Sequence, residues 1–362
     1  MRAPPDRQII RPIQMGAFTL QPACLALSLL SAFSFADAKE NKLLLSDSQT
    51  AELAAAQGPS SQGTHLRVSD SIRDLLDHPA FTRFGRLILP WDGRAYDADR
   101  RLNDIGSLLP YHSHVDPEIV VNALNRMVDD ISNGEDVFYD FYTEAQKREM
   151  PAKENTGLFF FRGRPGAPFA IIAPGGGFSY VGSVHEGFPY AVEISDRGYN
   201  AFVLRYRAGY GGRVATEDLA AAVTYVVRNA ERFGVSTEDY SLWGSSAGAR
   251  MAAAIGSHGV AAFGGDEVSR PSTVVMAYTA HSDHVSDEPP TFVVVGEQDG
   301  IAPPSAMERR VAALRRAGTE VEYRTYKDLG HGFGPGTGTS AEGWIADAIR
   351  FWEKFVTTGG AR

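Results

Sequence analysis

The chain has 362 residues, of which 43% are hydrophobic and 22% charged, with 37 Gly and 20 Pro. These proportions are ordinary for a globular protein and exclude collagen-like, coiled-coil and disordered classes. The formal net charge of −9 leaves no surplus of basic side chains to neutralise phosphates, so we do not expect nucleic acid as a partner.

Residues 1–38 have the layout of a secretory signal peptide. Three arginines precede an apolar run over 24–35, and the small-x-small sequence Ala36-Asp37-Ala38 follows it. The run is shorter than the roughly twenty residues that a membrane span needs, which disfavours the alternative of an uncleaved anchor. We therefore expect an exported protein, periplasmic or secreted, without stable membrane insertion after processing.

The only cysteine, Cys24, lies in this leader. A processed chain would then contain no disulfide, no cysteine nucleophile and no zinc–thiolate site. The small and polar residues over 39–64 indicate a linker.

Residues 65–136 form an N-terminal extension that matches no recognisable domain. Its clearest element begins at Asp116-Pro117, where an N-cap is followed by proline at the first helical position. Apolar residues then recur on one face until Gly134 ends the helix. We expect a partly helical segment that packs on a larger part of the protein and could cover its core.

From residue 137 to 358 the pattern changes to strands that alternate with helices. Short, continuously apolar runs are typical of strands buried on both faces. The alternation predicts a mostly parallel sheet with helices on both faces. Strands are expected at 137–142, 158–161, 169–173, 200–205, 240–243, 273–277, 292–295 and 321–326, and helices near 184–197, 215–233, 246–257, 304–317 and 341–357.

Three consecutive glycines follow the strand at 169–173, in the sequence Pro174-Gly175-Gly176-Gly177-Phe178. Their N–H groups are not shielded by side chains and can hold the oxyanion of a tetrahedral intermediate. The alternative, a phosphate-binding loop, needs glycine spacings or a following Lys that this sequence lacks.

The sharpest motif is Gly244-Ser245-Ser246-Ala247-Gly248, between a strand and an Ala-rich helix. In a G-x-S-x-G elbow the chain turns tightly and presents the central serine at the edge of the sheet. The motif predicts Ser246 as a nucleophile and the N–H of Ala247 as a second oxyanion donor. The alternative is a helix cap built from small residues.

A serine needs a base and an acid to become nucleophilic, and both follow in the sequence. Asp299 lies just past the strand at 292–295, and His331 lies in a glycine-rich loop before the last helix. Glu297 and Asp283 are alternative acids. The alternative for His331 is a loop histidine without a role.

Two groups of histidines resemble metal-binding clusters. They are His112 and His114 beside Asp116, and His281 and His284 beside Asp283. Neither group is expected on a helix with ligands at i and i+4, and neither contains cysteine, so we expect no metal. The second group could line the entrance to a substrate site. Four aromatic residues could stack on a sugar or aryl group, but packing is the commoner role: Trp91, Phe178, Tyr180 and Tyr210.

Together these residues resemble the α/β-hydrolase fold. The loop at 174–178, the sequence His185-Glu186-Gly187 and the sequence Phe-Val-Leu-Arg-Tyr-Arg at 202–207 are similar to the exported carbohydrate-esterase branch of the esterase/lipase group. That branch includes acetylxylan and feruloyl esterase-like proteins. The resemblance covers residues 137–358. Two residues depart from it: Pro174 stands where lipase-type relatives carry histidine, and Arg250 follows the elbow where a small residue is commoner.

The resemblance implies an α/β-hydrolase catalytic domain without a large inserted cap and without a cofactor. It implies a triad of Ser246, Asp299 and His331, and an oxyanion hole lined by Gly176, Gly177 and Ala247. We expect a serine carboxylic ester hydrolase acting through an acyl-enzyme on small-molecule or carbohydrate-linked short acyl esters. Two alternatives stay open, a serine peptidase or amidase with the same triad and a non-catalytic binding protein on a hydrolase scaffold.

Overall fold

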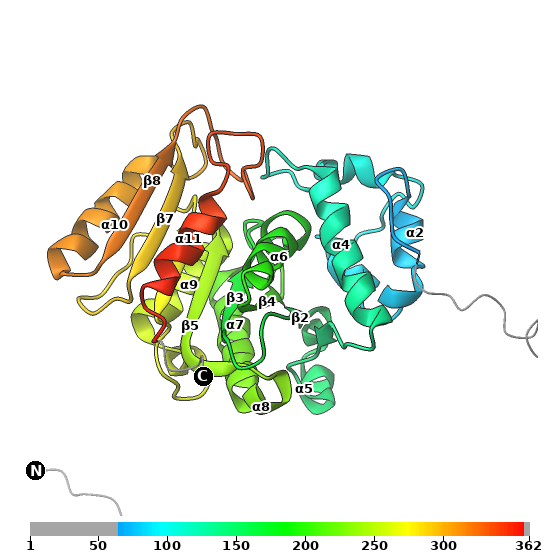
Figure 1. The fold of residues 1–362 in the computed structure, drawn as a ribbon, viewed down its shortest axis with the longest axis horizontal. Helices are drawn as coiled ribbons and strands as arrows, with labels where there is room; N and C mark the ends of the chain where they lie inside the picture. The colour runs from blue at the N-terminus through cyan, green and yellow to red at the C-terminus, as the bar shows by residue number, and fades with distance from the viewer. Residues whose placement is uncertain (1–63, 358–362) are drawn as a thin grey trace, which may run out of the picture. The chain divides into compact units, whose positions relative to one another are not determined.

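The computed structural model describes residues 64–357. The expected signal peptide and almost all of the expected linker lie outside these residues. An eight-stranded sheet forms the centre, in the spatial order β1-β2-β4-β3-β5-β6-β7-β8 (Figure 1). The strands are β1 Phe138–Tyr139, β2 Gly157–Phe161, β3 Pro168–Ala173, β4 Asn200–Arg205, β5 Ser236–Ser245, β6 Thr273–Ala277, β7 Thr291–Gly296 and β8 Val321–Tyr326.

The sheet is mostly parallel, as predicted. Only β2 runs against its neighbours, β1 and β4, and the remaining adjacent pairs are parallel. Ala173 of β3 pairs with Gly244 of β5, and Ser245 pairs with Ala277 of β6. These strands therefore end side by side, and the loops that follow them meet at one edge of the sheet.

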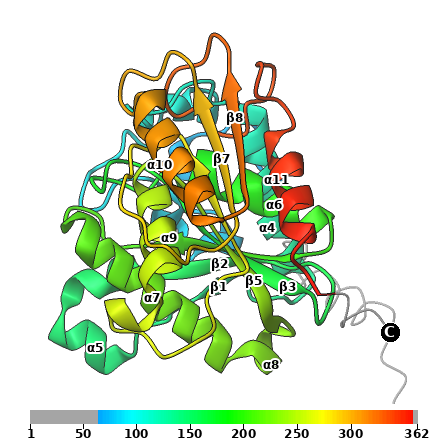
Figure 2. The ribbon, with the colours of Figure 1, turned by 90° about the vertical axis from the view of Figure 1, so that its left-hand side faces the viewer.

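Helices cover both faces of the sheet (Figure 2). Side chains such as Phe159 and Val294 point to the face covered by α6 and α11, whereas Phe160 and Val293 point to the face covered by α7, α9 and α10. The α-helices are α2 Ile72–Leu76, α3 Gly85–Ile88, α4 Pro117–Ser132, α5 Glu144–Glu149, α6 Phe188–Asp196, α7 Gly211–Arg228, α8 Ala230–Phe233, α9 Ala247–His258, α10 Pro304–Ala317 and α11 Trp344–Glu353.

Five further helical turns complete the described elements: η1 Pro79–Phe81, η2 Leu102–Leu108, η3 Pro151–Asn155, η4 Ser183–Gly187 and η5 Ala261–Phe263. Among them, η4 is a π-helix that leads directly into α6. Across residues 64–357, no helix is long and apolar enough to cross a membrane.

Most predicted elements are confirmed, with three local corrections. The strand predicted at 137–142 shortens to β1, because Thr143 caps α5 by accepting a hydrogen bond from the N–H of Gln146. The helix predicted at 215–233 divides into α7 and α8 at Asn229. The helix predicted at 341–357 begins only at Trp344, after Gly343 with a φ of 84°.

The extension packs into the same core as the sheet. The predicted start of α4 is confirmed, because Asp116 accepts a hydrogen bond from the N–H of Glu118 at 2.9 Å. The buried face of α4 packs with α6 and with the sheet side chains on that side. At the end of β4, the buried Arg205 donates to the carbonyl oxygens of Leu89 and Pro90, which fastens the extension to the sheet.

Candidate active site

Ser246 lies in a sharp turn between β5 and α9. Its φ is 50°, in the left-handed region that a non-glycine residue rarely adopts. The neighbouring strand β6 holds the turn, because the Ser246 N–H donates to the carbonyl oxygen of Ala277 at 2.8 Å. This is the geometry of a nucleophile elbow, with the side chain at the carboxyl edge of the sheet.

The two glycines of the motif are required by close backbone contacts. A Cβ at Gly244 would collide with the backbone of Gly248. A Cβ at Gly248 would collide with the carbonyl oxygen of Ala173 on the neighbouring strand. The motif therefore reflects how closely α9 approaches β3 and β5.

The structure brings Ser246, His331 and Asp299 into one chain of hydrogen-bonding groups. His331 Nε2 lies 2.8 Å from Ser246 Oγ, and His331 Nδ1 lies 2.8 Å from Asp299 Oδ2. The other oxygen of Asp299 accepts the N–H groups of Ile301 at 2.9 Å and Ala302 at 2.7 Å. Both Asp299 and His331 are buried, so water competes little for these contacts.

The two alternative acids lie elsewhere. Glu297 is exposed. Asp283 is also exposed and lies 2.9 Å from His258 Nε2. Asp299 is therefore the one of the three candidates that contacts His331.

The loop that carries His331 is held by the extension. Ser113 Oγ donates to the carbonyl oxygen of His331 at 2.9 Å, and the Ser113 N–H donates to that of Gly332 at 2.9 Å. Gly332 has a φ of 71°, and a Cβ there would collide with the carbonyl oxygen of Tyr111. Sequence reasoning missed this contact, because no local pattern links residues so far apart.

The glycine loop, residues 174–178, has backbone N–H groups near the elbow that can donate to a ligand. Within residues 64–357, the N–H groups of Gly176, Gly177 and Ala247 donate no hydrogen bond to protein atoms. Gly176 and Gly177 have φ values of 132° and 62°, which glycine adopts readily. The N–H of Gly175 is already engaged, because it donates to Glu186 Oε2 at 2.6 Å.

Glu186 is a buried charge behind this loop, and no role was predicted for it. Its Oε1 accepts the hydroxyl of Tyr278 at 2.7 Å and lies 3.0 Å from His112 Nε2. Burial alone would raise the pKa of Glu186, but the nearby His112 and the hydrogen bonds to the carboxylate outweigh it and lower the pKa to about 2. The carboxylate is therefore ionised and holds the glycine loop, Tyr278 and the extension together. The signals available in the sequence were its place in the motif His185-Glu186-Gly187 and its charge just before the apolar α6.

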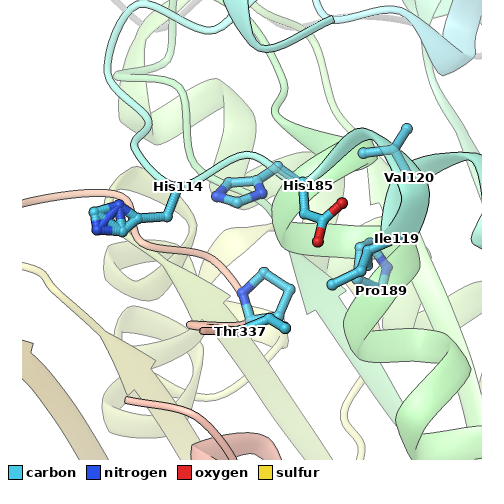
Figure 3. Close-up of a pocket in the computed structure, with 8 residues that line it drawn as sticks. His114, Ile119, Val120, His185, Pro189 and Thr337 are labelled. Atoms are coloured by element: carbon cyan, nitrogen blue, oxygen red, sulfur yellow. The ribbon is translucent and has the colours of Figure 1, made fainter. Parts of the chain in front are cut away.

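His185, beside Glu186, contacts the extension and the His331 loop. Its Nε2 lies 3.1 Å from the carbonyl oxygen of Ser113 and 3.2 Å from that of Gly332. Burial, reinforced by His112, lowers the pKa of His185 to about 4, so the ring is neutral near neutral pH. Figure 3 shows His185 with His114 of the extension and Thr337 beyond the His331 loop, and the space between them has no volume open to water.

The histidine groups singled out in the sequence are spread apart. His112 Nδ1 faces the hydroxyl of Tyr180 at 2.9 Å, whereas Asp116 caps α4. In the part of the chain that the structure describes, no three His, Cys, Asp or Glu side chains gather as metal ligands would.

The aromatic residues divide into two groups. Tyr180 is buried, and its ring lies 4.6 Å from that of the half-buried Trp91. Phe178 is half-buried beside the glycine loop, and Tyr210 is 57% exposed. Tyr180 is therefore a packing residue, whereas the other three keep a surface that a ligand can reach.

The sheet order, the elbow and the strand-end loops define the α/β-hydrolase fold. Two family models match successive parts of the chain: BD-FAE over residues 163–272 and the prolyl oligopeptidase family over residues 265–358. The two matches together run from just before β3 to the end of α11.

Two curated proteins resemble parts of the chain. An acetylxylan esterase from Xylanibacter ruminicola is 22% identical over 229 residues, which are 54% of this chain and 47% of that protein. Endo-1,4-beta-xylanase B from Butyrivibrio fibrisolvens is 32% identical over 93 residues, 24% of this chain and 14% of that protein. The chain thus spans about half of the first relative and a small part of the second.

Solved structures share the fold. The acetyl ester-xyloside bifunctional hydrolase from Caldicellulosiruptor lactoaceticus has a TM-score of 0.53 and 20% identity, covering 61% of this chain and 97% of that one. A thermophilic esterase from Thermogutta terrifontis with bound propionate has a TM-score of 0.50 and 18% identity, covering 56% and 92%.

Proposed function

We propose that the protein is a serine carboxylic ester hydrolase that works through an acyl-enzyme. The observation that carries this proposal is the chain Ser246–His331–Asp299, with two contacts of 2.8 Å. A binding protein would need neither a strained serine at a strand end nor a base oriented toward it.

In the first half of the reaction, Ser246 Oγ attacks the ester carbonyl carbon while His331 Nε2 takes the hydroxyl proton. The carbonyl oxygen becomes an oxyanion, and His331 then passes its proton to the leaving alcohol as the ester bond breaks. The N–H groups of Gly176, Gly177 and Ala247 are the donors for this oxyanion.

In the second half, His331 accepts a proton from water, and the resulting hydroxide attacks the acyl-enzyme. The acid is released when the proton returns to Ser246 Oγ. Asp299 accepts the Nδ1–H of His331 throughout, which orients the ring and stabilises its cationic form. Asp299 itself is fixed by two backbone N–H groups.

For the substrate, we propose short acyl esters carried by carbohydrate. The support is the likeness to a protein named acetylxylan esterase and to a structure named an acetyl ester-xyloside hydrolase. The proposed signal peptide agrees with it, because plant cell-wall glycans are met outside the cell. A peptidase or amidase is the second candidate, favoured by the match to the prolyl oligopeptidase family.

The test is hydrolysis of p-nitrophenyl acetate, longer acyl esters and p-nitroanilide amides. We expect Ser246→Ala to lower kcat at least about a thousandfold. The control is Ser179→Ala, which removes an exposed hydroxyl from the glycine loop. Equal rates in the wild type and Ser246→Ala would refute the proposal, and faster cleavage of the amides would favour the peptidase.

A further inference from the structure

A cleft of about 500 Å³ opens at the carboxyl edge of the sheet, beside the elbow. Pockets that bind small molecules range from about 300 to about 1,000 Å³. We call it the Arg250 cleft, and the lining residues that matter below are Phe178, Arg213, Arg250, Phe263, His281 and Asp283.

The Arg250 cleft adjoins Ser246. Arg250 lies one turn into α9, and its N–H donates to the carbonyl oxygen of Ser246 at 3.4 Å. Phe178 ends the glycine loop, and a Cβ at Gly212 would lie 3.1 Å from its ring, so α7 closes this side. The lining residues Arg250 and Phe178 therefore belong to the two elements that flank Ser246, the start of α9 and the glycine loop.

The Arg250 side chain is the unpaired cation of the cleft within residues 64–357. Arg213 is paired with Glu217 at 3.0 Å. The Asp283 carboxylate lies 2.9 Å from His258 Nε2. The Arg250 side chain is exposed and makes no hydrogen bond or ion pair within residues 64–357. An unpaired guanidinium that lines the cleft is an attractive point for an anion.

His281 adds a neutral polar group. Its Nε2 is buried without a hydrogen-bond partner in the described part of the chain. Burial, reinforced by the positive charges of Arg310 and Arg250, lowers the pKa of His281 to about 4. Arg310 is itself neutralised by Glu288 at 2.9 Å. The His281 ring is therefore neutral near neutral pH and adds no charge to the cleft.

Aromatic rings complete the lining. Phe178 is half-buried, and the guanidinium of Arg213 lies 5.2 Å from the centre of the Phe263 ring. Aromatic rings pack against the C–H faces of sugars, and an arginine fork matches the two oxygens of a carboxylate. The nearby Glu217 and Asp283 carboxylates disfavour a doubly charged phosphate.

We propose that the Arg250 cleft binds a carboxylate-bearing sugar, so that the favoured substrates are acyl esters on glycans that contain a uronic acid. This inference rests on the proposed esterase function. Arg250 pairs with the sugar carboxylate, and Phe178 packs on the ring.

The test compares kcat/KM for three substrates: p-nitrophenyl acetate, an acetylated neutral xylo-oligosaccharide and the same oligosaccharide with a glucuronic acid branch. We expect the wild type to prefer the acidic substrate, and the preference to fall as salt is raised. Arg250→Gln should lose about tenfold on the acidic substrate, mainly through KM, and leave p-nitrophenyl acetate unchanged. Arg250→Lys should recover part of the loss.

Arg309→Gln, an exposed arginine of α10, is the matched control. No preference in the wild type, or an equal loss of Arg250→Gln on all three substrates, would overturn the proposal. Binding of glucuronate, glucose and inorganic phosphate to the Ser246→Ala protein tests the ligand of the Arg250 cleft separately from the proposed esterase function. Glucuronate binding that needs Arg250 would support the cleft even if no ester is hydrolysed, whereas tighter binding of phosphate or glucose would refute it.

Discussion

At the scale of single residues, Glu186 connects the most parts of the site. One carboxylate oxygen accepts the Gly175 N–H, and the other meets Tyr278 and His112. It contacts no substrate in the proposed reaction and acts through the glycine loop, as a positioning residue. Its charge fixes the loop before the reaction begins, which is how preorganised donors contribute to rate.

We expect Glu186→Gln to lower kcat by roughly tenfold to a hundredfold with a smaller change in KM. The amide keeps one acceptor for Gly175, but its NH2 group faces donors on Tyr278 or His112. Steady-state kinetics on p-nitrophenyl acetate measure the effect, with the exposed Glu231→Gln as the control. An unchanged kcat would show that the loop holds its geometry without the charge.

The buried ionisable groups predict how stability depends on pH. His185 and His281 have pKa values lowered from 6.5 to about 4, so the unfolded chain binds protons there that the folded protein does not. Their contribution to the free energy of unfolding is complete above pH 6.5 and is lost as the pH falls toward 4. The pKa of Glu186 is lowered from 4.5 to about 2, so its contribution is lost between these values.

We therefore expect the free energy of unfolding to fall in two steps, by a few kcal/mol in total. Urea unfolding at a series of pH values measures it. His281→Gln should flatten the upper step and Glu186→Gln the lower one. A free energy of unfolding that stays constant between neutral pH and pH 4 would contradict the assignment to the histidines.

At the scale of elements, the loops that follow the strands could be predicted from the sequence. The residues that hold these loops in place could not. Ser246, Asp299 and His331 each belong to a local pattern, a strand end followed by glycine-rich sequence. The supports, Ser113 under the His331 loop and His112 beside Glu186, come from the extension and have no such pattern. Likewise, β1 was predicted too long because an apolar run does not reveal the cap at Thr143.

The support from the extension gives a prediction at this scale. Ser113→Ala removes the hydrogen bond to the His331 carbonyl, so we expect kcat to fall several-fold and the free energy of unfolding to fall by about 1 kcal/mol. Kinetics and urea unfolding measure both, with Ser179→Ala again as the control. A loss of stability with full activity would mean that Ser113 supports only the fold.

At the scale of the whole molecule, the sequence predicted the central sheet, its helices on both faces and the α/β-hydrolase fold. The reason is that periodicity and strand-end motifs are local, whereas the packing of the extension is not. The extension shares its core with α6 and α11, which come much later in the chain. Its role was therefore visible only in three dimensions.

This shared core has a consequence for how the chain folds. Leu66, near the start of the described residues, and Trp352, near their end, belong to one buried cluster. The cluster cannot close until the last helix has been synthesised and docked, so folding depends on contacts between residues distant in sequence, which form slowly. During synthesis, the segments made first must stay unpacked until their partners arrive, and this interval is when the chain is most exposed to proteases and aggregation.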